Sequence, residues 1–154
     1  MTKNTEKTAS SVWPLFLTAH AVLVSRIEAR LSQAGLPPLV WYDVLWALER
    51  APDNRLRMSE LADMTVLSRS NLTRLVDRLE SAGMVERARS EADRRGAFAV
   101  VTTSGKAMRR KIWPTYLAAI KELFDDHIES GEAEQMRTVL RRVLDAALES
   151  RDPQ

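Results

Sequence analysis

Residues 58–83 read MSELADMTVLSRSNLTRLVDRLESAG, and this stretch predicts two short helices joined by a tight turn. The first helix runs from about Ser59 to Met64, and a short connector leads to Ser68, a residue type that favours the N-cap of a helix. The second helix reaches Ala82, and Gly83 supplies the left-handed position that commonly closes a helix. Two helices in this arrangement are typical of a helix-turn-helix.

The second helix is predicted to have two chemically different faces. Apolar residues at helical spacing form its buried face: Leu72, Leu75, Val76 and Leu79. Polar and charged residues are turned away from that stripe: Ser70, Thr73, Arg74, Asp77 and Arg78. A helix that reads the major groove of DNA needs short donors and acceptors or guanidinium groups on its outer face. Taken alone, the pattern is more often that of an ordinary surface helix.

After Gly83 the spacing of apolar residues changes from a helical period to one typical of strands. Met84–Arg89 and Ala97–Thr103 predict two strands, and the polar segment Ser90–Gly96 between them predicts a long, basic loop. A basic hairpin placed directly after a helix-turn-helix indicates a wing, whose arginines enter the narrow, electronegative minor groove. The order of these elements therefore predicts a DNA-binding protein.

The remainder of the chain is predicted to be helical. Four segments show apolar residues at helical spacing: Val12–Ala34, Leu39–Arg50, Ser104–Glu129 and Glu132–Ser150. Pro14 suits the first turn of the first segment, whereas Pro114 predicts a kink or a break near Trp113. The expected fold class is mainly α, with a small β-hairpin wing.

Length and composition exclude several other classes. A chain of 154 residues suits a single domain, and the absence of cysteine excludes disulfides, thiolate zinc sites and thiol-based redox sensing. The polar start lacks the apolar core of a secretory signal, and no segment approaches the ~18 apolar residues of a membrane span, so we expect a cytoplasmic protein without a membrane partner. With His20 and His127 far apart and five unclustered glycines, we expect no enzyme, metal or cofactor.

Positive charge is concentrated in one part of the chain. From Ser68 to Lys111 there are eleven basic and five acidic residues, a net charge of +6 in a chain whose total is +2, so the rest nets −4. Such a segment indicates a polyanionic partner, with an ordinary solvated face as the alternative.

Several motifs resemble the MarR family of winged helix-turn-helix regulators. They are Met58–Ala62, Ser68–Val85, Asp93-Arg94-Arg95 and Val101-Thr102-Thr103-Ser104-Gly105. The last two are similar to the family's wing signature, with Val101 where leucine is usual. The resemblance covers about Leu36 to Gly105 by motif and the whole chain by the order of helices.

The resemblance implies a homodimer on double-stranded DNA. The first and last two helices of each subunit would intertwine, and each winged module would occupy half of a pseudo-palindromic operator. Residues 1–154 would form one domain, with dimerisation helices at about 12–35 and 106–150 and the winged module at about 39–103. The wide apolar faces of the terminal helices independently favour a dimer.

The exposed side chains of the second helix and the wing are the predicted DNA contacts. Ser70, Thr73 and Arg74 are expected at base edges, with Arg74 the best candidate for guanine. Phosphate contacts and register are assigned to Ser68, Arg69, Asn71, Arg78, Arg87 and Arg89. The family pattern implies that Asp93 braces the wing and that Arg95, or alternatively Arg94, enters the minor groove.

Aromatic residues suggest an effector site. Trp41 lies on a core stripe and is expected to pack, but Tyr42 and Trp46 lie off it and need a neighbour: the dimer partner, the first helix or a ligand. His20, within an apolar stripe, is either a satisfied core or interface histidine or a donor to a small carboxylate or phenol. MarR-like proteins commonly bind small aromatic acids and phenols, so the resemblance implies a cleft with these candidate residues: Trp13, His20, Tyr42, Trp46 and Trp113, with Arg26, Arg30 or Arg50 as anion partner.

These features together predict a sequence-specific transcriptional regulator, specifically a repressor that a small aromatic acid or phenol releases from its operator. A constitutive dimeric DNA-binding regulator with no effector is the alternative. A protein-interaction adaptor is disfavoured, because the predicted recognition helix and wing both keep their positive charge.

Overall fold

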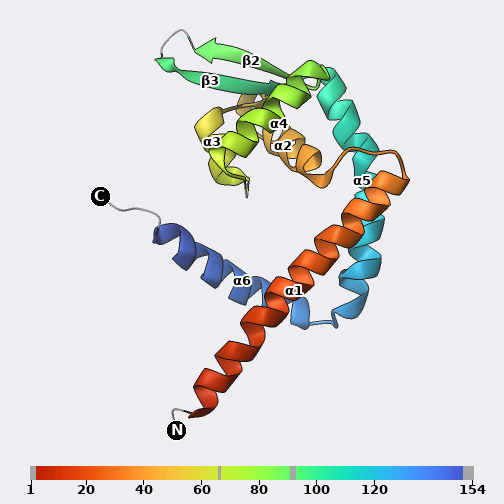
Figure 1. Ribbon diagram of the computed structural model, residues 1–154, viewed down its shortest axis with the longest axis vertical. Helices are drawn as coiled ribbons and strands as arrows, with labels where there is room; N and C mark the ends of the chain where they lie inside the picture. The colour runs from red at the N-terminus through yellow and green to blue at the C-terminus, as the bar shows by residue number, and fades with distance from the viewer. Residues whose placement is uncertain (1–2, 66, 91–92, 151–154) are drawn as a thin grey trace. The chain divides into compact units, whose positions relative to one another are not determined.

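The computed structural model describes residues 3–65, 67–90 and 93–150, and for 3–11, 90 and 93–95 it describes the backbone alone. The chain divides into two compact units, Met1–Ala118 and Ala119–Gln154. The first unit contains these elements (Figure 1): α1 (Lys3–Gln33), α2 (Leu39–Glu49), β1 (Arg55–Arg57), α3 (Met58–Met64), α4 (Arg69–Ser81), β2 (Val85–Ser90), β3 (Asp93–Val101) and most of α5 (Thr103–Leu123). The expected fold class, mainly α with a small β-hairpin wing, is confirmed.

The core of the first unit joins α2, α3, α4 and the base of the hairpin. Its fully buried side chains include Leu45 and Leu48 of α2, Leu61 of α3, Leu79 of α4 and Val85 of β2. Trp41 packs against this cluster, as expected. The burial of one face of α4 leaves the opposite face free, since the apolar residues of this helix recur at helical spacing.

The ends of α4 are built as the sequence indicates. The Ser68 hydroxyl oxygen accepts a hydrogen bond from the Asn71 backbone N–H at 3.3 Å, which is an N-cap. At the other end, Gly83 has a φ of +74°, the left-handed conformation that closes the helix. Both predictions are confirmed.

Hydrogen bonds of the Thr102 hydroxyl join the end of α4 to the start of α5. The Thr102 hydroxyl donates to the Gly83 carbonyl oxygen at 2.7 Å and accepts from the Gly105 backbone N–H at 3.0 Å. A Cβ at Gly105 would lie 2.2 Å from the Met84 carbonyl oxygen, so only glycine fits there. This contact explains the Thr-x-x-Gly part of the wing motif in structural terms.

The sheet has one strand more than the sequence predicts. Its order is β1-β3-β2, all antiparallel, with Arg57 opposite Phe98 and Ala88 opposite the same residue on the other side. The short β1 follows a 3-10 turn at Pro52–Asn54, and its three residues are too few to show a strand period. The expected loop Ser90–Gly96 is also shorter, because β3 begins at Asp93 and places Arg94 and Arg95 on strand backbone.

Two helix boundaries differ from expectation. The first helix begins at Lys3 instead of Val12, so Pro14 lies inside α1 and not in its first turn. The helix α5 ends at Leu123 instead of Glu129, and of the kink or break expected near Trp113 no break occurs, because Pro114 lies inside the helix. Proline removes one backbone donor, and the flanking turns of a long helix retain enough hydrogen bonds to continue past it.

The second unit consists of the end of α5, a 3-10 turn at Asp125–His127 and α6 (Glu132–Glu149). Gly131, with a φ of +95°, begins α6 in the left-handed conformation. Large apolar side chains form a stripe along α6, and each is 38–60% exposed: Met136, Val139, Leu140, Val143, Leu144 and Leu148. Within the described part of the chain, nothing in this unit buries that stripe.

Candidate nucleic-acid interface

The outer face of α4 presents a polar surface to solvent. Every residue assigned to this helix as a DNA contact is exposed: Arg69, Ser70, Asn71, Thr73, Arg74 and Arg78, together with the N-cap Ser68. The buried stripe on the opposite side fixes the rotation of the helix about its own axis. The side chains therefore face outward as a set, as the helical spacing predicts.

Two hydroxyls of this surface already have backbone partners. Thr73 Oγ1 donates to the Arg69 carbonyl oxygen at 3.0 Å, and Ser68 Oγ caps the helix while lying 3.3 Å from Ser70 Oγ. The Thr73 hydroxyl thus offers only its oxygen as an acceptor in this rotamer, whereas the exposed Arg74 guanidinium offers donors alone. Among the predicted base-reading residues, Arg74 has the longest reach.

The cationic residues of α4 lie along both of its flanks. Asn71, Arg74 and Arg78 line a shallow cleft beside Val40 of α2 and Leu67. Arg69 and Thr73 line a second cleft on the α3 side, with Met58 and Ser59. Positive charge on both sides of an exposed polar ridge suits a helix that lies between the two phosphate backbones of a groove.

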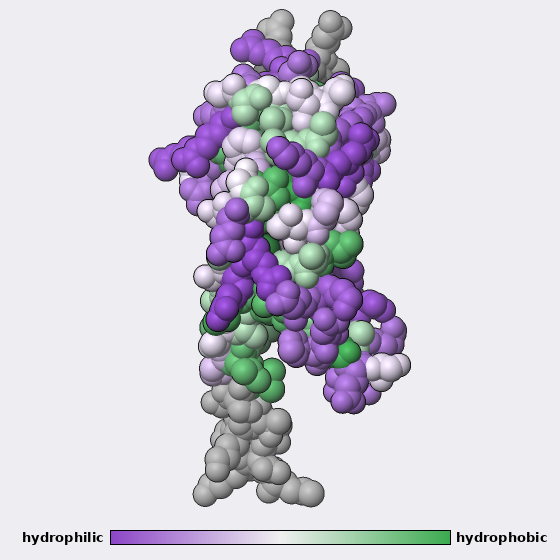
Figure 2. Space-filling model, turned by 90° about the vertical axis from the view of Figure 1, so that its right-hand side faces the viewer, coloured by the Kyte–Doolittle hydropathy of each residue, from purple (hydrophilic) through white to green (hydrophobic). Residues whose placement is uncertain are grey.

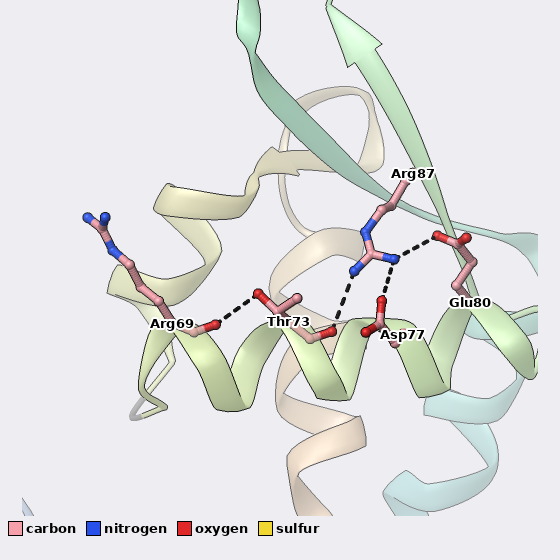
Figure 3. A network of polar contacts seen from close by, with 5 residues as sticks. All are labelled: Arg69, Thr73, Asp77, Glu80 and Arg87. Carbon is pink, nitrogen blue, oxygen red and sulfur yellow. Dashed lines mark hydrogen bonds and ion pairs between the residues drawn. The ribbon is translucent and has the colours of Figure 1, made fainter.

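Arg87 joins the hairpin to α4. Its guanidinium Nη1 lies 2.6 Å from Asp77 Oδ1 and 3.4 Å from Glu80 Oε2, and Nη2 donates to the Thr73 carbonyl oxygen at 3.4 Å (Figure 3). These three partners occupy successive turns on one side of α4, so Arg87 holds β2 against that side of the helix. The prediction that Arg87 contacts phosphate stays untested, and DNA would have to compete with these carboxylates.

The residue predicted to brace the wing is Asp93, whereas the contacts of Arg87 with α4 were not predicted. The side chains of Asp93, Arg94 and Arg95 lie outside the part of the structure that is described, so their predicted roles stay predictions. Asp77 and Glu80 stand three residues apart on α4, and this spacing was the available signal for a shared cationic partner.

Two further arginines stand beside the hairpin. The guanidinium carbon of Arg55 lies 4.9 Å from the centre of the Phe98 ring, and that of Arg57 lies 5.3 Å from it. Both come from β1, the strand that the sequence did not predict, and they share the Phe98 face of the sheet. Arg89, by contrast, lies on the opposite face and is exposed, as a phosphate contact requires.

The residues assigned to an effector cleft are only partly brought together. The ring of Tyr42 stacks on Trp113 with centroids 5.6 Å apart, and Tyr116 meets both rings edge-on. Tyr42 is 6% exposed and therefore has a neighbour, as expected, but that neighbour is α5 and not the dimer partner, the first helix or a ligand. Burial raises the pKa of Tyr42 and of Tyr116, which stay neutral donors near pH 7.

The other residues assigned to the effector cleft lie outside the cluster of rings formed by Tyr42, Trp113 and Tyr116. Trp46 is 38% exposed and has the Arg109 guanidinium 4.8 Å above its ring. His20, Arg26 and Arg50 are exposed, and Trp13 stacks on Phe16 of its own helix. In the described part of the chain no cluster of His, Asp or Glu is suited to a metal ion.

The helix α4 has one buried and one exposed face, and a basic antiparallel hairpin follows it. Together with the flanking helices, this arrangement defines a winged helix-turn-helix protein. The model of the MarR family matches residues 34–96, the segment that holds these elements. The chain is 31% identical to AbsC, a MarR family transcriptional regulator from Streptomyces coelicolor, over 91% of this chain and 94% of that one, with a TM-score of 0.82. The chain therefore belongs to the MarR family.

Two other similar proteins carry names that bear on function. Sco3205, a MarR family transcriptional regulator from Streptomyces coelicolor, was solved in complex with DNA; it is 30% identical over 89% of this chain and 86% of that one, with a TM-score of 0.82. The transcriptional repressor MprA of Escherichia coli K12 is 30% identical over 100 residues, which are 65% of this chain and 56% of MprA. These relatives are regulators and not enzymes, as expected for this chain.

No helix in the described ranges is long and apolar enough to span a membrane.

Replacing Arg87 with glutamine should loosen the hairpin without unfolding the protein. The ion pairs are partly exposed, with Arg87 at 30% and Asp77 at 58%, so their loss should cost only about 0–1 kcal/mol of stability. Amide hydrogen exchange in β2 should nevertheless accelerate, because the link to α4 is gone. Arg89→Gln makes the same charge change on the same strand and serves as the control. Equal exchange rates in the two variants would show that Arg87 does not brace the wing.

Proposed function

We propose that this protein is a sequence-specific DNA-binding regulator that acts as a homodimer. The observation that carries the proposal is the exposed polar face of α4, which includes Ser70 and Arg74 and is joined through Arg87 to a basic hairpin. This geometry allows the helix to enter the major groove while the hairpin follows the adjoining minor groove. A similar protein, Sco3205, was solved in complex with DNA.

The residues of the interface divide into those that read bases and those that hold phosphates. We assign base edges to Ser70 and Arg74, with Thr73 as an acceptor, because these side chains are exposed on the polar side of α4. The flanking residues hold phosphates and register: Ser68, Arg69, Asn71, Arg78 and Arg89. Arg95, with Arg94 as the second candidate, enters the minor groove next to Asp93.

Dimerisation is proposed from the uncovered apolar surface. Besides the α6 stripe, α1 exposes Val12, Trp13 and Leu15 at 60–69%, and Figure 2 shows hydrophobic surface gathered over this part of α1. Exposed apolar surface of this extent is typical of an interface and not of a monomer. A second copy of the chain covers both regions in the proposal, and two-fold symmetry then presents two recognition helices to one operator.

We further propose that a small aromatic acid or phenol releases the protein from its operator, so that it acts as a repressor in the cytoplasm. Trp113, which stacks on the buried Tyr42, and Trp46 are 36% and 38% exposed and offer aromatic surface for such a ligand. A ligand lowers operator affinity only by the difference in its affinity for the two spacings of the recognition helices. A constitutive regulator without an effector remains the second candidate.

Arg74 and Arg95 should affect DNA binding in different ways. Arg74→Ala should lower the affinity for a selected operator by about 1–3 kcal/mol and leave the affinity for random duplex nearly unchanged. Arg95→Ala should weaken both duplexes alike and reduce the salt dependence, because it removes a contact that any sequence offers. Titration of labelled duplexes at several salt concentrations measures both effects. Lys111→Ala removes an exposed charge of α5 and is the control. An unchanged preference for the operator in Arg74→Ala would contradict the assignment of base reading to this residue.

The effector should quench tryptophan fluorescence and release DNA over the same concentration range. Benzoates and phenols are the compounds to titrate, with Trp113→Phe expected to weaken the response because the ring that stacks on Tyr42 is changed. Quenching without release would place the ligand at a site that does not control DNA binding. If no compound quenches or releases, the constitutive regulator is the correct account.

A further inference from the structure

Two helices of the first unit, α2 and α5, are held together in antiparallel register by large side chains. Along α2, Tyr42 meets Trp113 and Tyr116 of α5, and Trp46 meets Arg109 one to two turns earlier in α5. Later residues of α2 therefore contact earlier residues of α5, which means that the two helices run antiparallel. The C-terminal residue of α2, Glu49, completes this series by pairing with Arg109.

Arg109 makes three different contacts with α2. Its Nε and Nη2 both donate to the Glu49 carboxylate, the latter at 3.3 Å, in a two-pronged pair. The guanidinium also lies 4.8 Å above the Trp46 ring, and its positive charge partly offsets the effect of burial on the pKa of Tyr42. A planar guanidinium is the only cationic group that can serve two carboxylate oxygens and stack on an indole at once.

The pair is almost removed from solvent. The Arg109 side chain is 13% exposed and that of Glu49 is 15% exposed, in contrast to Arg110, which is 66% exposed and lies 3.7 Å from Glu49. Sliding of one helix along the other would separate the two buried charges and leave each without its partner. Because such uncompensated charges are costly, the pair strongly resists sliding. Its two-pronged geometry fixes orientation as well as distance.

The opposite end of α2 reaches the recognition helix. Val40, in its first turn, lines the cleft in which Asn71, Arg74 and Arg78 of α4 lie. The helix α2 thus contacts α5 from Tyr42 to Glu49 and contacts α4 near its N-terminal end. Any shift of α2 along α5 moves the surface against which the recognition helix rests.

We propose that Arg109 is a positioning residue for DNA recognition, which acts through Glu49 and α2 to set the placement of α4. The inference rests on the proposed function, because α5 belongs to the proposed dimerisation helices and α4 to the DNA surface. In a dimer, the two recognition helices must stand about one turn of DNA apart, roughly 34–36 Å. Arg109 therefore controls how strictly the protein distinguishes the correct spacing of half-sites, without touching DNA.

The test compares spacing discrimination in four variants: Arg109→Gln, Glu49→Gln, Arg110→Gln and the charge exchange Glu49→Arg with Arg109→Glu. The probes are a duplex selected from a random pool by the wild-type protein, the same duplex with one base pair inserted between its half-sites, and a random duplex. In Arg109→Gln and Glu49→Gln, the ratio of affinities for the first two duplexes should fall about tenfold, while affinity for random duplex stays unchanged. Arg110→Gln should behave as the wild type, and the charge exchange should restore most of the ratio.

Thermal unfolding and sedimentation show whether each variant is a folded dimer. If Arg109→Gln does not fold, Glu49→Gln decides, because it keeps the shape of the side chain. An unchanged ratio in the folded variant would overturn the inference, as would an equal loss on all three duplexes, which indicates a purely structural role. Failure of the wild type to select any sequence would instead refute the proposed function itself.

Discussion

Four apolar side chains of α4, Leu72, Leu75, Val76 and Leu79, pack into a core shared with α2, α3 and β2, and their burial fixes the rotation of the helix. Each such side chain contributes about 1.5–3 kcal/mol when fully buried. An exposed ion pair such as Arg87 with Asp77 contributes about 0–1 kcal/mol. Packing therefore determines which face of α4 is free to contact DNA, and the polar contacts adjust the elements around it.

Two of those elements have separate attachments to α4. The hairpin is tied to its side by Arg87 and to its end by the Thr102–Gly83 hydrogen bond. The helix α5 is joined to α4 by the hydrogen bond from the Gly105 backbone N–H to the Thr102 hydroxyl. It is also joined indirectly through α2, whose Glu49 pairs with Arg109. The recognition surface is thus attached to α5 by the Thr102–Gly105 hydrogen bond and by α2, which meets α5 through Tyr42 and Glu49. Such a construction suits a regulator in which small movements of the helices change affinity for DNA.

The helices α2, α3 and α4, the two ends of α4 and the hairpin were predictable, because apolar periods and turn residues such as Ser68 and Gly83 are local signals. The strand β1 was not, since three residues carry no period and pair only with the distant β3. That α5 is the neighbour of Tyr42 was missed for a similar reason: Trp113 lies some 70 residues later in the chain. In the site, the exposed residues of α4 followed from the helical spacing, whereas the partners of Arg87 and Arg109 depend on tertiary contacts that one sequence does not encode visibly.

The central claim is that two copies of this chain read two half-sites through α4 and the wing. Hydroxyl-radical footprinting on a duplex selected from a random pool, with the stoichiometry measured on the same complex, tests it most directly. The account predicts two protected segments about one helical turn apart, roughly 10 base pairs from centre to centre, with two chains bound per duplex. A single protected segment with one chain, or uniform protection without a preferred sequence, would contradict it.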